Sequence, residues 1–366
     1  MTSGPLLSAI SLDARTGGIA QVSRMLWRAM TNAWPEARLV RLCPDGRIRA
    51  TRTDKARFCT RVLVEQMLAG ARWVVFTHLD LLRVLSLVPA GRRRPYAVFL
   101  HGIEAWGPLK ARDERLLAQA TLRLANSTFT AERVMSRHPL FGPVVACPLA
   151  LPLPRPPAEG RERQDLDDIE RMNVGPVAVL IVGRMLAAER YKGHDQLIEA
   201  WPHVLERVPE AQLIMVGDGD DAERLRGRVS HAGLGDKVIF TGFIANAVLH
   251  SLYERCAVFA MPSRGEGFGL VYLEAMAHRL PCVGSRQDAA SEIIVDRETG
   301  LLVDQHDIPG LADAIVLLLG DQKLRASMGA AGFRRLHERF SLDQFSDRVV
   351  VSLREAFEAP RMAGRS

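Results

Sequence analysis

The second half of this chain, from about residue 174 onward, repeats one pattern: a short apolar run followed by a longer segment of helical character. The apolar runs that we predict as strands are 177–182, 211–216, 237–241, 257–261 and 281–284. The intervening segments that we predict as helices are 193–207, 221–232, 246–255 and 269–279. Strands that are apolar throughout are typical of a parallel sheet with helices on both faces. The pattern therefore predicts a doubly wound α/β domain.

The first half has the same rhythm, though less regularly. Here we predict strands at 5–12, 37–42, 72–77, 96–100, 121–125 and 143–147, with helices that include 18–31 and 127–137. A chain of 366 residues is also longer than one ordinary core requires, and it suits two domains. We therefore predict two doubly wound α/β domains facing a central cleft, with ligands beyond the carboxyl ends of the strands.

A proline-rich stretch followed by a charged one separates the two halves. Five prolines lie between Pro148 and Pro157, and residues 159–171 are rich in charge. Proline removes a backbone donor and stiffens the chain, which is typical of a linker between domains. We predict a first domain over 1–158, a linker over 159–173, a second domain over 174–341 and a C-terminal helical segment over 342–366.

Charge is distributed unevenly between the halves. Residues 1–160 contain 23 Lys and Arg against 11 Asp and Glu, whereas the rest contains 25 against 31. A basic half suggests that the first domain meets an anionic partner. Aromatic residues make up only 6% of the chain, and no nucleic-acid-binding signature is present. We therefore expect an anionic membrane surface or an anionic acceptor, and no nucleic acid.

The location of the protein follows from its cysteines and apolar runs. The five cysteines are scattered and never form a CxxC pair, which suits reduced thiols better than disulfides or zinc ligands. No apolar run approaches the ~20 residues that cross a bilayer, and the first residues lack the basic segment of a secretory signal. We expect a cytoplasmic protein that is peripheral at the inner face of the cytoplasmic membrane.

Two basic clusters mark the surface that would meet such a membrane. One is a stretch that mixes cations with apolar residues, as an interfacial helix does: Arg52, Lys55, Arg57, Phe58, Arg61, Val62 and Leu63. The other is the run of three arginines from Arg92 to Arg94.

Several chemistries are excluded by absent motifs. The chain contains no GxSxG nucleophile elbow, no GxxxxGK[ST] phosphate loop and no HExxH zinc pair. A GxGxxA run starts at Gly217, but three aspartates beside it would repel a dinucleotide pyrophosphate. Asp218 and Asp220 also form a DxD, the metal-binding pair of another transferase fold. We interpret these aspartates as helix caps and expect no metal.

The strongest local signal is a glycine-rich loop between a strand and a helix, over residues 262–276. Glycines let a ligand approach the backbone, and the first free N–H groups of a helix bind phosphate without metal. Glu266 lies in the loop, and Glu274 lies about five residues into the helix, which is ~7.5 Å along its axis. Two carboxylates that flank an anion site from different directions can accept hydrogen bonds from hydroxyl groups. One carboxylate would bind the hydroxyls of a sugar, and the other would bind those of a ribose.

This segment resembles the retaining family 4, or group 1, of glycosyltransferases, through its Pro-Ser strand end, its GFG and the spacing between Glu266 and Glu274. Over roughly 175–345 the resemblance is specific, and it includes the segments 182–194, 216–219 and 292–303. In the first half it is looser, and it rests on Thr16–Gly18, His101–Gly102 and Ala125–Ser127. The resemblance implies the GT-B fold, with two Rossmann-like domains and a C-terminal helix that crosses back to the first one.

The resemblance also implies a role for each matching residue. Arg184 and Lys192 would bind the donor diphosphate, Glu266 the hydroxyls of the sugar, and Glu274 the ribose. The main chain of Gly269, Leu270 and Val271 would bind the terminal phosphate. The other positions that would meet the donor are Gly17, Gly18, Gly183, Gly267 and Phe268. The alternative for Arg184 and Lys192 is a pair of solvated loop cations.

Two residues of the first half have further roles under the resemblance. His101 would lie beside the donor sugar and position it in the transition state, and its alternative is a packing residue at a strand end. Glu104 would touch the acceptor or, equally, cap the segment that follows. We interpret His78 as a strand-end residue and Ser127 as the cap of the helix after it.

In two places the chain departs from the family pattern. Residues 285–291 occupy the position where relatives usually carry a Gly-Gly pair before the acid at Glu292. Residues 19–21 lack the acid that many relatives have after the paired glycines. Contacts from these two segments cannot be transferred from the family.

The expected function is that of a retaining, metal-independent hexosyltransferase. It would move a hexose from UDP-hexose or GDP-hexose to a glycan or lipid-linked acceptor, in the synthesis of cell-surface polysaccharide or glycolipid. The nucleotide diphosphate sugar would be a co-substrate, and no cofactor is expected. The alternatives are a nucleotide-sugar 2-epimerase of the same fold, a phosphorylase that needs pyridoxal phosphate, and a non-catalytic nucleotide-binding module.

Overall fold

The computed structural model describes residues 4–13, 17–44, 47, 49–68, 70–151 and 172–359. The chain folds as two compact units. The first comprises the residues up to Ala150 together with those from Leu342 onward, and the second runs from Leu151 to Ser341. Most of the linker predicted over 159–173 lies outside the described residues.

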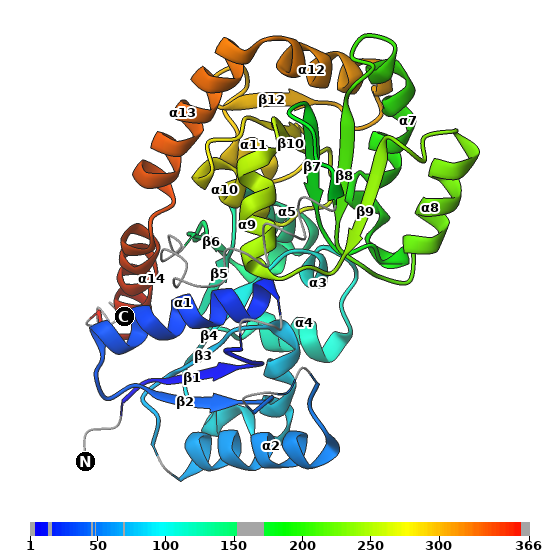
Figure 1. Cartoon of the computed structure of the whole chain (residues 1–366). Coiled ribbons are helices and arrows are strands. Elements are labelled where there is room, and N and C mark those ends of the chain that lie inside the picture. The colour runs from blue at the N-terminus through cyan, green and yellow to red at the C-terminus, as the bar shows by residue number, and fades with distance from the viewer. Residues whose placement is uncertain are drawn as a thin grey trace. The chain divides into compact units, whose positions relative to one another are not determined.

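The first unit contains a six-stranded parallel sheet in the order β2-β1-β3-β4-β5-β6 (Figure 1). Its strands are β1 (Leu6–Ala9), β2 (Arg38–Arg41), β3 (Val74–Phe76), β4 (Tyr96–Leu100), β5 (Leu122–Ala125) and β6 (Val145–Ala146). Each lies inside a predicted strand. The helices are α1 (Gly18–Ala33), α2 (Arg52–Met67), η2 (Leu79–Leu87), η3 (Ala90–Arg92), α3 (Ile103–Trp106), α4 (Ala111–Ala118), α5 (Thr128–Arg137), η4 (Pro139–Phe141) and α14 (Leu342–Phe357).

The second unit contains another six-stranded parallel sheet, in the order β12-β11-β10-β7-β8-β9. Its strands are β7 (Ala178–Val182), β8 (Gln212–Val216), β9 (Val238–Gly242), β10 (Val258–Met261), β11 (Cys282–Ser285) and β12 (Gly300–Val303). Its helices are η5 (Ala187–Lys192), α7 (His194–Leu205), α8 (Ala222–His231), α9 (Asn246–Arg255), α10 (Leu270–Ala277), α11 (Ala290–Ile293), α12 (Ile308–Gly320) and α13 (Gln322–Arg339). The prediction of two doubly wound parallel sheets is confirmed.

The last helix, α14, packs within the first unit and lies beside α1 (Figure 1). The rings of Trp73 and Phe357 stack with centroids 4.8 Å apart, and Trp34 Nε1 donates a hydrogen bond of 2.8 Å to Glu358. Phe345 is fully buried. The apolar face of α14 therefore completes the core on one side of the first sheet.

The interfacial helix predicted around Phe58 differs from the helix that forms. In α2 the side chains of Phe58 and Val62 are buried in the core of the first unit, and Leu63 packs partly against that core. They therefore cannot enter a membrane, and the expectation that they would is wrong. The exposed apolar residues of this region lie instead at the end of α2, at Val64, Met67 and Leu68.

Both sheets have the geometry that creates a binding site at their centre. In the second unit the chain starts at β7, moves outward through β8 and β9, and then returns to β10 on the other side of β7. Loops that leave β7 and β10 diverge from this point, and ligands of open α/β sheets bind beyond the carboxyl ends of such strands. Among the described residues, no helix is both long and apolar enough to cross a membrane.

Candidate functional site

The predicted donor residues of the second unit follow the carboxyl ends of β7 and β10, in the loop after each strand and in the helix α10 after the second loop. Val258 and Phe259 of β10 pair with Val179 and Leu180 of β7, so these loops start side by side. The loop after β7 carries Gly183, Arg184 and Lys192, and the loop after β10 carries residues 262–269. The structure therefore brings the predicted cations and the glycine-rich segment together.

An ion pair joins the two loops. Lys192 Nζ lies 2.9 Å from Glu266 Oε2 and 4.0 Å from Glu189 Oε2. The guanidinium of Arg184 pairs with Glu189 as well. The side chain of Lys192 is 13% exposed, whereas that of Arg184 is 71% exposed, so water screens the charge of Lys192 less. Each cation is thus matched by a carboxylate, and Glu189 lies between the two cations.

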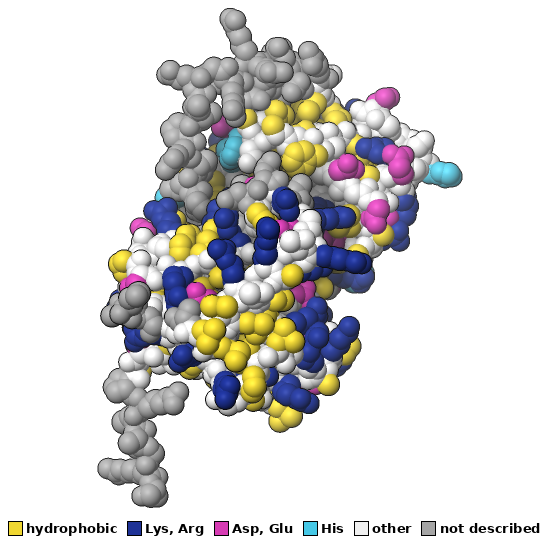
Figure 2. Space-filling model, turned by 90° about the horizontal axis from the view of Figure 1, so that it is seen from below, with side chains coloured by type: hydrophobic (Ala, Val, Ile, Leu, Met, Phe, Trp, Pro, Cys, Tyr) yellow, Lys and Arg dark blue, Asp and Glu magenta, His cyan; other side chains and the backbone are white. Residues whose placement is uncertain are grey.

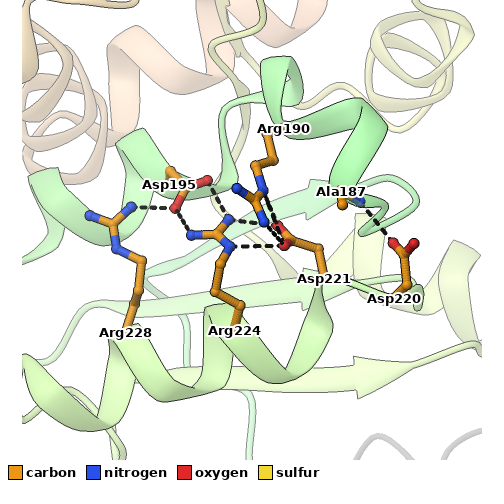
Figure 3. A network of polar contacts seen from close by, with 7 residues as sticks. All are labelled: Ala187, Arg190, Asp195, Asp220, Asp221, Arg224 and Arg228. Atoms are coloured by element: carbon orange, nitrogen blue, oxygen red, sulfur yellow. Dashed lines mark hydrogen bonds and ion pairs between the residues drawn. The ribbon is translucent and has the colours of Figure 1, made fainter.

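The loop that carries Lys192 is fixed from its other side by the loop after β8 (Figure 3). Ala187 N donates a hydrogen bond of 2.8 Å to Asp220, and Arg190 lies 2.6 Å from Asp221. Arg224 then bridges Asp221 to Asp195, in the first turn of α7, at 2.6 and 2.7 Å. The hydrogen bonds from Arg224 hold the pKa of Asp221 well below its usual range. This network keeps the short helix η5 against the sheet.

The aspartates after Gly217 are not helix caps, so that interpretation is wrong. Asp218 Oδ1 accepts from Gly219 N at 2.8 Å, and Asp220 accepts from Ala187 N. Asp221, at the N-cap of α8, makes no side-chain cap bond. These carboxylates instead close their own loop and tie it to η5. Gly217 is required there, because a Cβ on it would lie 2.0 Å from the carbonyl oxygen of Gly183.

The glycine-rich loop ends at the start of α10. Gly269 occupies its N-cap with φ 93°, where a Cβ would lie 2.6 Å from the ring of Tyr272 and 3.3 Å from Glu266 Cγ. The first N–H groups of a helix, here those of Leu270 and Val271, have no partner within the helix. Phe268 is buried and its ring lies 5.9 Å from that of Phe340, so only its main chain could meet a donor.

Glu274 lies further along α10, and a second residue positions its carboxylate. Tyr253 donates from its hydroxyl to Glu274 Oε2 at 3.0 Å. Burial raises the pKa of Glu274, and the Tyr253 hydrogen bond opposes the rise. Tyr253 also stacks on His278, whose Nε2 lies 2.9 Å from Nδ1 of His250. The carboxyl proposed for the ribose is therefore held on one side by a fixed phenol.

In the first unit, His101 follows β4 in a defined tautomer. Its Nε2 lies 2.7 Å from the carbonyl oxygen of Thr77, so Nε2 carries the proton and Nδ1 is left as an acceptor. Burial lowers the pKa of His101, which keeps the ring neutral at neutral pH. Glu104 Oε1 accepts from the main-chain N of His101 at 2.5 Å. Glu104 therefore closes the turn after β4.

Four other predicted residues surround the strand ends of the first unit. Gly17 has φ 89° and precedes α1, whose first residue is Gly18; Thr16 lies outside the described residues. The prediction that Ser127 caps the next helix is confirmed, because its hydroxyl accepts from Thr130 N at 2.9 Å. His78 caps η2 by accepting from Asp80 N.

Two carboxylates of the second unit, Glu189 and Asp288, lie at the site but were not predicted from the sequence. Glu189 lies three residues before Lys192, so the spacing of acids around that cation could have indicated it. Asp288 lies in the segment that departs from the family pattern, is fully buried, and accepts from Glu266 N at 3.1 Å. Only the fold reveals that this acid lies beneath the glycine-rich loop.

A fold of two doubly wound parallel sheets of this kind is the GT-B fold. Residues 162–335 match the family described as Glycosyl transferases group 1. This match spans just under half of the chain, and over this segment the predicted resemblance to the group 1 glycosyl transferases is confirmed.

Two curated relatives show what the chain is similar to. One is the GDP-mannose-dependent alpha-(1-6)-phosphatidylinositol monomannoside mannosyltransferase of Mycolicibacterium smegmatis, 34% identical over 66% of this chain and 65% of the relative. The other is the alpha-D-kanosaminyltransferase of Streptomyces kanamyceticus, 34% identical over 54% of this chain and 49% of the relative. The chain thus covers less than two thirds of the length of either relative.

Solved structures share the fold over nearly the whole chain. The HepE protein of Anabaena in complex with UDP-glucose has a TM-score of 0.74 at 18% identity, over 97% of this chain and all of that one. Sucrose-phosphate synthase from Thermosynechococcus elongatus has a TM-score of 0.75 at 22% identity, over 98% of this chain and all of that one. These likenesses confirm the GT-B architecture.

One residue of the site makes the second unit sensitive to acid. His194 follows Gly193 at the start of α7, is 3% exposed, and its Nε2 has no hydrogen-bond partner among the described residues. Burial, with the nearby charge of Lys192, lowers the pKa of His194 to about 4. As pH falls below about 6.5, His194 becomes protonated in the unfolded chain, whereas in the folded chain it stays neutral until about pH 4. Falling pH therefore favours the unfolded chain.

We predict that this proton linkage removes on the order of 3 kcal/mol of stability between pH 7 and pH 4. His194→Leu should flatten the pH dependence of the free energy of unfolding, measured with urea, by about that amount. His203→Leu, at an exposed position of the same helix, is the control and should leave the pH dependence unchanged. If His194→Leu lost as much free energy of unfolding between pH 7 and pH 4 as the wild type, His194 would not be the source of the pH dependence.

Proposed function

We propose that this protein is a retaining hexosyltransferase that moves a hexose from UDP-hexose or GDP-hexose to a glycan or lipid-linked acceptor. The observation that carries the proposal is the ion pair of 2.9 Å between Lys192 and Glu266, which joins the cation loop to the glycine-rich loop. A group that binds phosphate and a group that binds hydroxyls are thereby held next to each other. The family and the named relatives support the same class of reaction.

The donor would exchange partners with residues that are already paired. Its diphosphate would replace Glu189 as the partner of Arg184, and it would replace Glu266 as the partner of Lys192. The N–H groups of Leu270 and Val271 would bind the terminal phosphate. Glu266, released from Lys192, would then accept hydrogen bonds from the sugar hydroxyls. Glu274, held by Tyr253, would accept those of the ribose. Because carboxylates already balance the cations, donor binding replaces one set of anionic contacts with another.

Catalysis would come from contacts that strengthen as the leaving diphosphate gains charge. As the bond between the anomeric carbon and the phosphate oxygen breaks, Arg184 and Lys192 stabilise the charge that develops. The acceptor oxygen attacks the same face of the sugar, and its proton passes to a phosphate oxygen of the leaving group. This front-face route retains the configuration and differs from hydrolysis by a pair of carboxylates across the bond. Neutral His101 would position the sugar through its Nδ1.

The names of the relatives suggest which donor and which class of acceptor to test. The relative from Mycolicibacterium smegmatis is named for GDP-mannose and a phosphatidylinositol mannoside, and the Anabaena protein was crystallised with UDP-glucose. We therefore propose a GDP- or UDP-linked hexose as donor, a lipid-linked or glycan acceptor, and a role in glycolipid or polysaccharide synthesis. A panel of both donors, with and without acceptor, tests this. Donor consumed without any acceptor would favour an epimerase instead.

The first test concerns the diphosphate cations. Arg184→Ala and Lys192→Ala should each lower turnover at least a hundredfold, because a loss of about 2.7 kcal/mol in transition-state stabilisation corresponds to that factor. Lys323→Ala, an exposed cation of the same unit, serves as the control. Circular dichroism and the melting temperature show whether each variant is folded. Near-normal turnover in either folded variant would remove that residue from the site.

We further propose that the first unit docks on an anionic membrane surface at the inner face of the cytoplasmic membrane. Figure 2 shows hydrophobic and basic side chains gathered on the face of this unit where α2 lies. We define the docking patch as four exposed apolar residues with four exposed cations: Val64, Met67, Leu68, Leu87, Arg57, Arg61, Arg92 and Arg94.

Both basic clusters contribute to this patch because the structure brings them together. Arg94 N donates a hydrogen bond of 2.8 Å to Gln66 Oε1, so the second cluster lies against the last turn of α2. Arg93, in contrast, donates to the carbonyl oxygens of Leu85 and Val88 and to Gln119, and these bonds hold it on the protein. Apolar tips surrounded by cations are typical of surfaces that insert shallowly into anionic bilayers.

Flotation with liposomes tests the docking patch. Binding should require anionic lipid and weaken as salt rises. The triple variant Arg61→Ala, Arg92→Ala, Arg94→Ala should bind about a hundredfold more weakly, since each cation near an anionic leaflet contributes about 1 kcal/mol. A triple variant of exposed cations of the second unit, Arg207→Ala, Arg255→Ala, Lys323→Ala, is the matched control. Equal flotation with neutral and anionic lipid, or none with either, would contradict docking.

A further inference from the structure

The segment where the chain departs from its family contains a buried acid beneath the sugar-binding loop. Asp288 has no exposed surface, although it lies between β11 and α11 at the carboxyl edge of the sheet. Its Oδ2 accepts from Glu266 N at 3.1 Å, and its Oδ1 accepts from Ala290 N at 3.0 Å. The hydroxyl of Ser263 is a further hydrogen-bond partner. One carboxyl group therefore connects the end of β10, the glycine-rich loop and α11.

The same segment holds Glu266 at both of its main-chain groups. While Asp288 accepts from Glu266 N, the next residue, Ala289, donates from its N to Glu266 O at 3.4 Å. The side chain of Glu266 is bound separately by Lys192. Because the backbone of Glu266 is fixed by residues 288 and 289, the direction of its carboxylate toward a ligand depends on them.

Burial and one neighbouring charge oppose the negative charge of Asp288. That charge is Glu266, which faces it from the glycine-rich loop. Burial, with a contribution from Asp288, raises the pKa of Tyr272 on α10 and of Tyr191 on η5, which keeps both phenols neutral. Burial raises the pKa of Asp288 to about 7, against the hydrogen bonds from Ala290, Glu266 and Ser263. The carboxyl group thus changes its protonation within the neutral range. Only the ionised form offers both oxygens as full acceptors to the two N–H groups.

We propose that Asp288 is a positioning residue that fixes the main chain of Glu266 and thereby orients the Glu266 carboxylate toward the hydroxyls of the donor sugar. This inference rests on the proposed function of Glu266, and it adds a residue that acts through Glu266 without touching the donor. Below neutral pH the acid is protonated, its hold on Glu266 N weakens, and sugar recognition declines. Above neutral pH both hydrogen bonds are complete.

The test is the pH profile of kcat/KM for the donor, measured between pH 5.5 and 8.5 on the full chain. The wild type should show a rise with an apparent midpoint close to pH 7. Asp288→Asn should lower kcat/KM roughly tenfold or more at pH 8 and should lose that midpoint, because an amide offers one acceptor and does not titrate. Asp307→Asn is the matched control, since asparagine also caps a helix and Asp307 caps α12. It should leave the profile unchanged.

A second variant keeps the test decisive if Asp288→Asn does not fold. Ser263→Ala retains the acid but removes a hydrogen bond that favours its ionised form, so the midpoint should shift to higher pH. An unshifted midpoint in Ser263→Ala, or a midpoint that persists in folded Asp288→Asn, would overturn the inference alone. A wild type that turns over no donor would overturn the proposed function, and this inference with it.

Discussion

The pairing of β7 with β10 at the centre of the second sheet determines everything that follows in this unit. Because the two strands are parallel and adjacent, their loops begin at the same edge. One loop carries cations and the other carries glycines and an acid, and the proposed donor site needs both. The ion pair between Lys192 and Glu266 closes the gap between them. Strand order, rather than any single motif, therefore creates the site.

The charges at this site are balanced before a donor arrives. Glu189 pairs with Arg184, and Glu266 pairs with Lys192. A further network of aspartates and arginines fixes the cation loop to the loop after β8 and to α8. Lys192, which is largely buried, would be unfavourable without a partner, whereas the exposed Arg184 is screened by water. In the proposed site, these carboxylates hold the cations where the diphosphate would bind. Their release on binding would couple phosphate recognition to sugar recognition, because Glu266 serves both states.

The sequence was sufficient to predict two doubly wound sheets and eleven of their twelve strands, because apolar strands leave strong local patterns. It did not predict β12, a four-residue edge strand with two partly exposed residues, since exposure weakens the apolar signal. It also assigned Phe58 and Val62 to the wrong side of α2, because an apolar stripe looks the same whether it faces a core or a membrane. The loop aspartates were assigned to the wrong role and Asp288 to none, since the partners that decide the roles of Asp220 and Asp288 are distant in sequence.

The central claim is that the second unit binds the diphosphate of a nucleotide sugar, and calorimetric titration of the full chain tests it directly. With EDTA present, GDP or UDP should bind at least tenfold more tightly than the matching monophosphate, since a further phosphate contacting Lys192 should add about 1.4 kcal/mol or more. In Lys192→Ala that difference should largely disappear. Equal affinities for the diphosphate and monophosphate in the wild type, or binding of neither, would contradict the account.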